Sequence, residues 1–248
     1  PKRIRDDANV EYLKKYDADI IIVAAFGQIL PKSILDMPRY GCVNVHASLL
    51  PKYRGAAPIQ WAVINGDAIT GVTTMRMDVG LDTGDMIAKR EVRIAEDETG
   101  GSLFDKLAEV GAKLCVETMD MLEKGTATFT PQNNEMSTHT SMITKELGNI
   151  DWKKPAVELE RLVRGLNPWP SAYTHLNNKT FKIWKAKVIP EDSEYQPGCI
   201  VRADKHDLIV QTGEGQLALL EVQLEGKKRM EADAFLRGNQ LEEGTFFA

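Results

Sequence analysis

Two polar side chains that could do chemistry together, Asn44 and His46, stand two residues apart in an expected β-strand at residues 42–46. Side chains at positions i and i+2 of a strand point to the same side, so these two project together while Val43 and Val45 face the other way. Histidine supplies a base near neutral pH, and an asparagine amide can donate a hydrogen bond to a developing oxyanion. A histidine that is merely hydrogen-bonded at the end of a strand would give the same pattern.

A carboxylate, Asp82, occupies the glycine-rich turn GLDTGD at residues 80–85. The two glycines permit a tight loop, which could bring Asp82 over the ends of neighbouring strands. A carboxylate there could orient a histidine or stabilise the protonated, positively charged form of its ring. A turn aspartate that hydrogen-bonds its own backbone is the plainer alternative. Asp-Thr-Gly also occurs in aspartic proteases, but these need two such aspartates and an all-β pattern, whereas this sequence holds one.

The loop at residues 48–58 follows the Asn44/His46 strand directly and carries two cations, Lys52 and Arg54. Loops after sheet strands often carry function, and cations at the mouth of a cleft suit phosphate or carboxylate groups. An ordinary surface loop has the same composition. No cysteine or histidine stands at metal-ligand spacing, so the sequence predicts no metal site.

The elements that must position these residues form an α/β layered domain, expected over residues 1–125. The apolar run at 20–26 is typical of a strand buried on both faces in a parallel sheet, and Ser102 is the expected N-cap of the longest helix. The remaining expected elements of this domain are helices at 9–16, 59–64 and 103–124 and strands at 42–46, 71–77 and 86–94.

The composition changes after Gly125. Residues 126–144 are rich in Thr, Ser, Asn and Gln without helical or strand periodicity, which predicts a linker between domains. A second domain is expected over residues 145–248, with one helix at 157–166. Four short β-like segments follow, which favours a small antiparallel barrel; they lie at 180–188, 198–202, 207–211 and 216–223.

Composition excludes several classes of protein. With 248 residues, 43% hydrophobic and 27% charged, the chain is typical of globular domains. No apolar run reaches the ~18–20 residues of a membrane span. The three cysteines are too widely spaced for a disulfide framework, which favours a reducing compartment and predicts a cytoplasmic location. Because the net charge is −5, a nucleic-acid partner would need a local basic patch.

Several longer motifs resemble the methionyl-tRNA formyltransferase family. The first half carries NVHASLLP at 44–51, RGAAPI at 54–59 and DVGLDTG at 78–84, and the second half carries IDW at 150–152, NPWP at 167–170, GKKRM at 226–230 and FLRG at 235–238. The Asn-x-His pair and the later aspartate are similar to residues shared by all folate-dependent formyltransferases of this fold. The second-half motifs narrow the resemblance to the formyltransferases that act on tRNA.

The resemblance implies transfer of the formyl group of 10-formyltetrahydrofolate to the amino group of methionyl initiator tRNA, in translation initiation. Asn44 would hydrogen-bond the formyl oxygen, His46 would stabilise the oxyanion or assist proton transfer, and Asp82 would hold His46 and relay the proton. The resemblance also implies a Rossmann-like catalytic domain whose first segment, of about 60 residues, is not present in this sequence. An OB-like β-barrel that binds tRNA is implied to follow it. A monomer without metal is implied as well.

The resemblance further implies two sets of binding residues. Those expected to contact folate are Phe26, Gly27, Gln28, Ser48, Leu49, Leu50, Pro51, Val79 and Leu81. Those expected to contact tRNA are Lys52, Arg54, Lys227, Lys228 and Arg229. Two other functions stay open from the residues: a sugar-nucleotide amine formyltransferase, which would keep the catalytic residues, and a non-catalytic tRNA-binding fragment.

Overall fold

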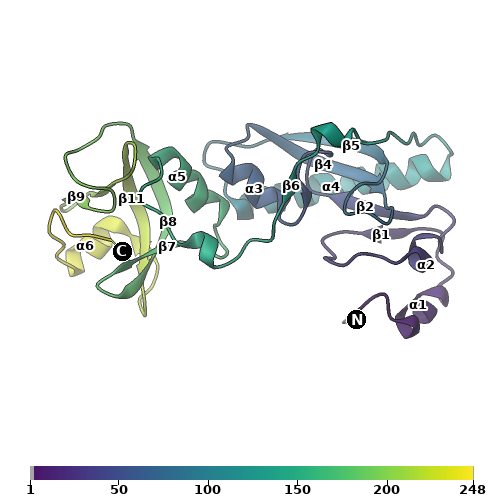
Figure 1. The fold of residues 1–248 in the computed structure, drawn as a ribbon, viewed down its shortest axis with the longest axis horizontal. Coiled ribbons are helices and arrows are strands. Elements are labelled where there is room, and N and C mark those ends of the chain that lie inside the picture. Colours follow the sequence, from purple (N-terminus) through teal and green to yellow (C-terminus); the bar gives the residue numbers. More distant parts are fainter. Residues whose placement is uncertain (1–2, 248) are drawn as a thin grey trace. The chain divides into compact units, whose positions relative to one another are not determined.

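The structure is a computed structural model that describes residues 3–247. The chain divides into two compact units (Figure 1). Unit 1 comprises Pro1–Trp61, Ala68–Ala95 and Leu103–Met142, and unit 2 comprises Ala62–Asp67, Glu96–Ser102 and Ile143–Ala248. No helix within residues 3–247 is both long and apolar enough to cross a membrane.

A mixed four-stranded sheet forms the centre of unit 1, in the order β1-β2-β4-β5. Its strands are β1 (Ile21–Val23), β2 (Cys42–His46), β4 (Ile69–Arg76) and β5 (Met86–Arg93). β1 runs parallel to β2, whereas β4 is antiparallel to both of its neighbours, β2 and β5. The apolar run was expected in the middle of a parallel sheet, buried on both faces. It does pair in parallel with β2, but within the described residues β1 is a three-residue edge strand that is not fully buried, and the sheet is mixed.

Helices cover this sheet. α1 (Asp7–Lys14) and α2 (Lys32–Leu35) pack beside β1 through a small apolar cluster that includes Val10 and Ile34 (Figure 1). The long helix α4 (Gly100–Glu123) approaches β2 closely at Gly111, where a Cβ atom would lie 3.1 Å from a Val45 methyl.

Helix α4 begins three residues earlier than expected, at Gly100 instead of Leu103. The hydroxyl of Thr99, not that of Ser102, caps its first turn by accepting from the backbone N–H of Ser102 at 3.0 Å. The Ser102 hydroxyl accepts in turn from the backbone N–H of Thr99 at 3.0 Å. Ser102 therefore stands at the third helical position of a reciprocal cap, where we expected the capping residue itself.

The segment expected as a linker contains short secondary-structure elements, and its residues up to Met142 belong to unit 1. β6 (His139–Thr140) pairs in parallel with β3 (Arg54–Gly55), and Thr130 bridges to Met86. A single 3-10 turn, η1 (Asn134–Met136), lies between these contacts. Residues 130–142 therefore lie beside the loop that follows β2. Within that region of the chain, helix α3 (Pro58–Ile64) comes after β3.

Unit 2 is built on an antiparallel six-stranded sheet in the order β7-β8-β11-β10-β9, with β12 paired to β11. Its core contains an aromatic cluster in which Phe181 contacts Phe235 and Phe247. A closed barrel is not confirmed, because within residues 3–247 no pairing joins β7 to β9. The elements are η2 (Glu146–Gly148), α5 (Ala156–Gly165), β7 (Ala172–Leu176), β8 (Lys179–Ile189), β9 (Ile200–Ala203), β10 (Leu208–Gln211), β11 (Gln216–Leu224), β12 (Met230–Glu231) and α6 (Ala232–Gly238).

Candidate active site

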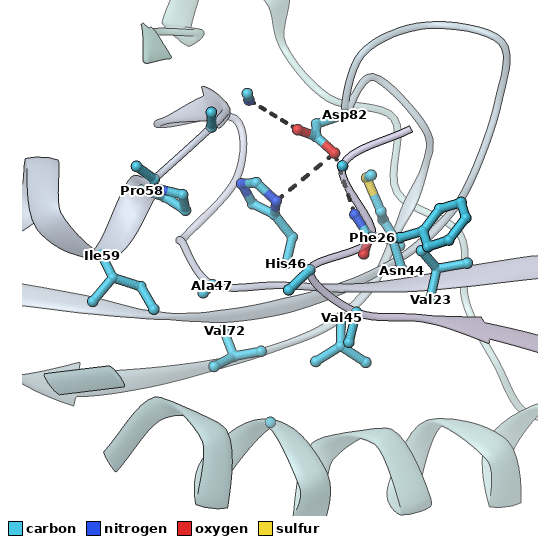
Figure 2. A pocket seen from close by; sticks show the side chains of 18 of the residues that line it. Val23, Phe26, Asn44, Val45, His46, Ala47, Pro58, Ile59, Val72 and Asp82 are labelled. Atoms are coloured by element: carbon cyan, nitrogen blue, oxygen red, sulfur yellow. Dashed lines mark hydrogen bonds and ion pairs between the residues drawn. The ribbon is translucent and has the colours of Figure 1, made fainter. Parts of the chain in front are cut away.

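Strand β2 delivers Asn44 and His46 to one side of the sheet, as the alternation predicts. Figure 2 shows both side chains turned toward Asp82, whereas Val45 points to the opposite face of the sheet. Asn44 is 9% exposed and His46 is 7% exposed. Burying two polar side chains in this way is costly unless each is hydrogen-bonded, so their partners decide how the site works.

The loop between β4 and β5 brings Asp82 back over the end of β2. Its turn is closed by Asp78, whose Oδ1 accepts from the Gly80 backbone N–H at 3.0 Å and from the Thr83 hydroxyl at 2.7 Å. At Gly84 a Cβ atom would lie 1.8 Å from the Arg76 carbonyl oxygen, so only glycine fits the close return of the chain. Asp82 itself has a left-handed backbone with φ of 52°.

The Asp82 carboxylate joins the cluster together. Its Oδ1 accepts from Nδ2 of Asn44 at 3.2 Å and lies 3.7 Å from Nδ1 of His46. Its Oδ2 accepts from the backbone N–H of Gly55 at 2.8 Å (Figure 2). The structure thus brings together all three residues that the sequence nominated for catalysis.

The ring of His46 is oriented by a backbone carbonyl. Its Nε2 lies 2.9 Å from the carbonyl oxygen of Tyr53, and a carbonyl can only accept, so Nε2 carries a hydrogen. In the neutral ring Nδ1 then has no hydrogen and can accept a proton. Nδ1 is the nitrogen that faces Asp82, so the basic atom of the ring lies beside the carboxylate.

A cavity of about 930 Å³ adjoins this cluster in unit 1. Asn44, His46 and Asp82 line it, and the wall includes four of the nine expected folate contacts, namely Phe26, Gly27, Gln28 and Leu81. The other five expected contacts, Ser48, Leu49, Leu50, Pro51 and Val79, are not among the lining residues. The cavity has the size of a small-molecule site and a mainly apolar wall with a few converging polar groups.

The stretch 48–51 contributes to the framework of the site. Ser48 is fully buried and its hydroxyl donates to the carbonyl of Lys52 at 2.5 Å. The backbone N–H of Leu50 donates to the Thr73 hydroxyl at 3.1 Å, and that hydroxyl donates to the Ser48 carbonyl at 2.7 Å. These bonds tie the loop after β2 to strand β4, which fixes the carbonyl of Tyr53 against His46.

Arg54 does not present a cation to solvent. Only 3% of its surface is exposed, and its guanidinium donates to Oε1 of Gln132 and Oδ1 of Asn134, both at 2.9 Å. The expectation of an exposed cation at Arg54 is therefore wrong, because the segment 130–142 packs over it. Lys52 is exposed, with its ammonium 4.7 Å from the centre of the Tyr53 ring.

In unit 2, residues 226–229 of the GKKRM motif lie in the exposed turn between β11 and β12, and Met230 begins β12. Lys227 and Lys228 are exposed on this turn. Arg229 is held in place: its guanidinium donates to both carboxylate oxygens of Glu221 and lies 4.6 Å from the centre of the Trp184 ring. The hydrogen bond from Arg229 lowers the pKa of Glu221 below its ordinary value.

Sequence reasoning missed the contribution of residues 130–142 to the site. Nε2 of Gln132 donates to the carbonyl oxygens of Asp82 and Gly84, each at 2.8 Å. The hydroxyl of Thr138 accepts from the backbone N–H of Tyr53 at 2.8 Å. Both residues lie in the segment expected as a linker, where no periodicity or motif gave a signal. Within residues 3–247 no cluster of three or more His, Cys, Asp or Glu side chains could hold a metal ion.

The class of protein follows from comparison with known families. The formyl transferase family matches residues 1–119, and the formyl transferase C-terminal domain family matches residues 142–240. A crystal structure of HypX from Aquifex aeolicus in complex with tetrahydrofolic acid has the same fold at a TM-score of 0.68 and 20% identity, covering 96% of this chain and 44% of that one. The two family matches thus place the chain among the formyl transferases.

Two curated relatives give the particular family. A methionyl-tRNA formyltransferase of Agathobacter rectalis is 74% identical over 247 residues, which is 100% of this chain and 80% of the relative. A second, of Lachnospira eligens, is 57% identical over 99% of this chain and 79% of its own length. The chain belongs to the methionyl-tRNA formyltransferase family.

Proposed function

We propose that this protein transfers the formyl group of 10-formyltetrahydrofolate to the amino group of methionyl initiator tRNA, with Asn44, His46 and Asp82 as its catalytic residues. One observation carries the proposal: an amide, an imidazole and a carboxylate converge on the wall of a large cavity, with the carboxylate within 3.7 Å of both partners. Identity of 74% with a methionyl-tRNA formyltransferase supports this choice over other acyl transfers.

The cavity has the features that a folate donor requires. Phe26 and Leu81 offer apolar surface suited to a flat ring, and the polar cluster stands beside them in the same wall. The bound donor would supply the formyl carbon next to Asn44 and His46. Ser48, Leu49, Leu50, Pro51 and Val79 stay predicted folate contacts, among which Val79 is 68% exposed on the same loop as Leu81.

Asn44 is the proposed oxyanion donor. When the amino nitrogen attacks the formyl carbon, the carbonyl electron pair moves to the formyl oxygen, which becomes negative. An asparagine amide carries two hydrogens, so Nδ2 can donate one to Asp82 and the other to that oxygen. Because Asn44 is held before the substrate arrives, it stabilises the charge without reorganising at the moment of reaction.

His46 is the proposed proton carrier, and Asp82 is proposed to support it. The attacking amine must lose one proton, and the N10 nitrogen of the donor must gain one when its bond to the formyl carbon breaks. His46 Nδ1 can accept the first proton and return it to N10, so the ring ends the cycle unchanged. The Asp82 carboxylate, 3.7 Å away, stabilises the positive charge that the ring carries between these steps.

The second unit is the proposed tRNA-binding part. Lys227 and Lys228 stand exposed at the end of the β11–β12 turn, where phosphates can reach them. We keep Lys52 as a candidate contact on unit 1. The reaction belongs to translation initiation, and the three free cysteines support a cytoplasmic location.

Two other functions make different predictions. A sugar-nucleotide amine formyltransferase would share the cluster, and a sugar 3N-formyl transferase structure has this fold at 21% identity. A tRNA-binding protein without catalysis would bind tRNA with strong salt dependence but transfer no formyl group. The experiment is a formyl-transfer assay of the full-length protein with methionyl initiator tRNA and, separately, with a dTDP-amino sugar. Transfer to the tRNA alone is expected; transfer to the sugar alone, or tRNA binding without transfer, would contradict the proposal.

A further inference from the structure

We propose that Gln132 is a positioning residue for Asp82. It lies outside the catalytic cluster, in the segment between α4 and unit 2 that resembles a linker in sequence. Its amide group connects the loop that carries Asp82 to the buried guanidinium of Arg54. The inference deepens the proposed function. Its activity measurement rests on that function, whereas its structural measurement does not.

The orientation of the Gln132 amide follows from its partners. Two carbonyl oxygens, those of Asp82 and Gly84, each lie 2.8 Å from Nε2, and carbonyls can only accept. On the other side Arg54 Nε lies 2.9 Å from Oε1, and a guanidinium can only donate. Turning the amide over would therefore break three hydrogen bonds at once, so the side chain has one orientation.

The Asp82 backbone needs such support. A residue other than glycine at φ of 52° is in the sparsely populated left-handed region, which persists only where the surroundings fix it. The Asp78 turn closes the near side of the loop at Gly80 and Thr83. Gln132 holds its far side, because it binds the carbonyls on either side of Thr83.

Arg54 holds Gln132 in turn. Its buried guanidinium donates to Gln132 and to Asn134, two residues apart on the same segment. The backbone of Arg54 is fixed as well, since its N–H donates to the Thr138 carbonyl at 2.8 Å. The resemblance nominated Arg54 as a tRNA contact, whereas these bonds give it an internal role, because it holds the side chain that holds the catalytic loop.

The position of Asp82 matters on a scale of about 1 Å. Its Oδ1 must reach both Asn44 and His46, at 3.2 and 3.7 Å. A misplacement of about 1 Å in a catalytic group can cost about 100-fold in rate. Loss of the two Gln132 bonds is therefore expected to lower kcat by about 10- to 100-fold, while KM for the tRNA stays within about two-fold.

The test uses two variants of the full-length protein. Gln132→Ala removes the amide, and Gln132→Glu keeps its size and its contact with Arg54 but places an oxygen against the two carbonyls. Glu135→Gln, an exposed change on the same segment, is the matched control and should leave kcat unchanged. If the alanine variant fails to fold, the glutamate variant carries the measurement.

Two readouts separate positioning from general destabilisation. In an Asp82→Asn background the Gln132 changes should have little further effect on kcat, since they act through a side chain already disabled. A loss of the same size in both backgrounds, or a kcat within about two-fold of wild type in both variants, would overturn the inference. Crystal structures of the wild type and Gln132→Glu decide it independently of activity: a shifted Asp82 carboxylate supports the inference, and an unmoved one overturns it. An inactive wild type would contradict the proposed function alone.

Discussion

The backbone N–H of Gly55 donates to Oδ2 of Asp82 at 2.8 Å, so the strand segment after β2 holds one oxygen of the carboxylate while Asn44 holds the other. Gly55 reaches this position with φ of 100°, a backbone conformation that favours glycine. It also pairs with Thr140 in the short ladder between β3 and β6. The glycine of the RGAAPI motif thus has a physical role in the catalytic cluster.

Replacing Gly55 by alanine should disable the site. A Cβ atom there would lie 2.7 Å from the Thr140 carbonyl oxygen, so either β6 or the Gly55 backbone must move. The Asp82 hydrogen bond depends on that backbone, and kcat is expected to fall by about 10- to 100-fold. Steady-state kinetics with methionyl-tRNA measures the change.

Gly125→Ala is the matched control for this variant. Gly125 also has a positive φ, of 66°, but no atom lies within 4 Å of the position of its Cβ. It should lose about 1 kcal/mol of unfolding free energy from backbone strain and keep its kcat. Equal activities for the two alanine variants would show that the Gly55 contact does not matter for turnover.

Part of the site could be read from the sequence because it follows from alternation and turn chemistry. Asn44 and His46 share a side because they are two apart in a strand, and Asp82 returns to them because Gly84 permits a chain approach that no other residue fits. The contributions of Gln132 and Tyr53 could not be read in this way. One acts from an aperiodic segment and the other through its backbone carbonyl, and neither leaves a pattern in side-chain types.

The exposed lysines of the β11–β12 turn should contribute to tRNA affinity by binding phosphates. The logarithm of the tRNA association constant falls linearly with the logarithm of the salt concentration. In the double variant Lys227→Ala/Lys228→Ala this fall is expected to become less steep, by about 1 for each phosphate that the protein no longer neutralises. KM for the tRNA should rise while kcat changes little. Lys32→Ala, at a surface lysine paired with Asp36, serves as the control. An unchanged salt slope would remove the two lysines from the interface.

Glu221 should make unit 2 sensitive to acid. Its hydrogen bond from Arg229 lowers its pKa below the ordinary value of 4.5, which means that folding favours its charged form. That stabilisation is present above the ordinary pKa and is lost as the pH falls through the lowered folded value. The difference in unfolding free energy between wild type and Glu221→Gln should therefore shrink as the pH is lowered from about 7 towards about 3. A difference that stays constant with pH would contradict this.

The fold of unit 2 was only partly readable from its sequence. The strands at β8, β9, β10 and β11 were expected, but β7 was not, although Asn177 and Asn178 both adopt positive φ and connect it to β8. Two adjacent asparagines between β-like runs are a hairpin signal that could have revealed it. Closure of a barrel was not readable, because it depends on which edge strands meet and not on the local pattern of any one strand.

The proton-carrying role of His46 is the central claim, and His46→Ala tests it most directly. The variant should retain tRNA binding within about two-fold and lose kcat by about 100- to 10,000-fold, the range that general acid–base catalysis supplies. His206→Ala, at an exposed histidine of unit 2, is the matched control and should behave as wild type. A His46→Ala protein that transfers formyl groups to methionyl-tRNA at the wild-type rate would contradict the account.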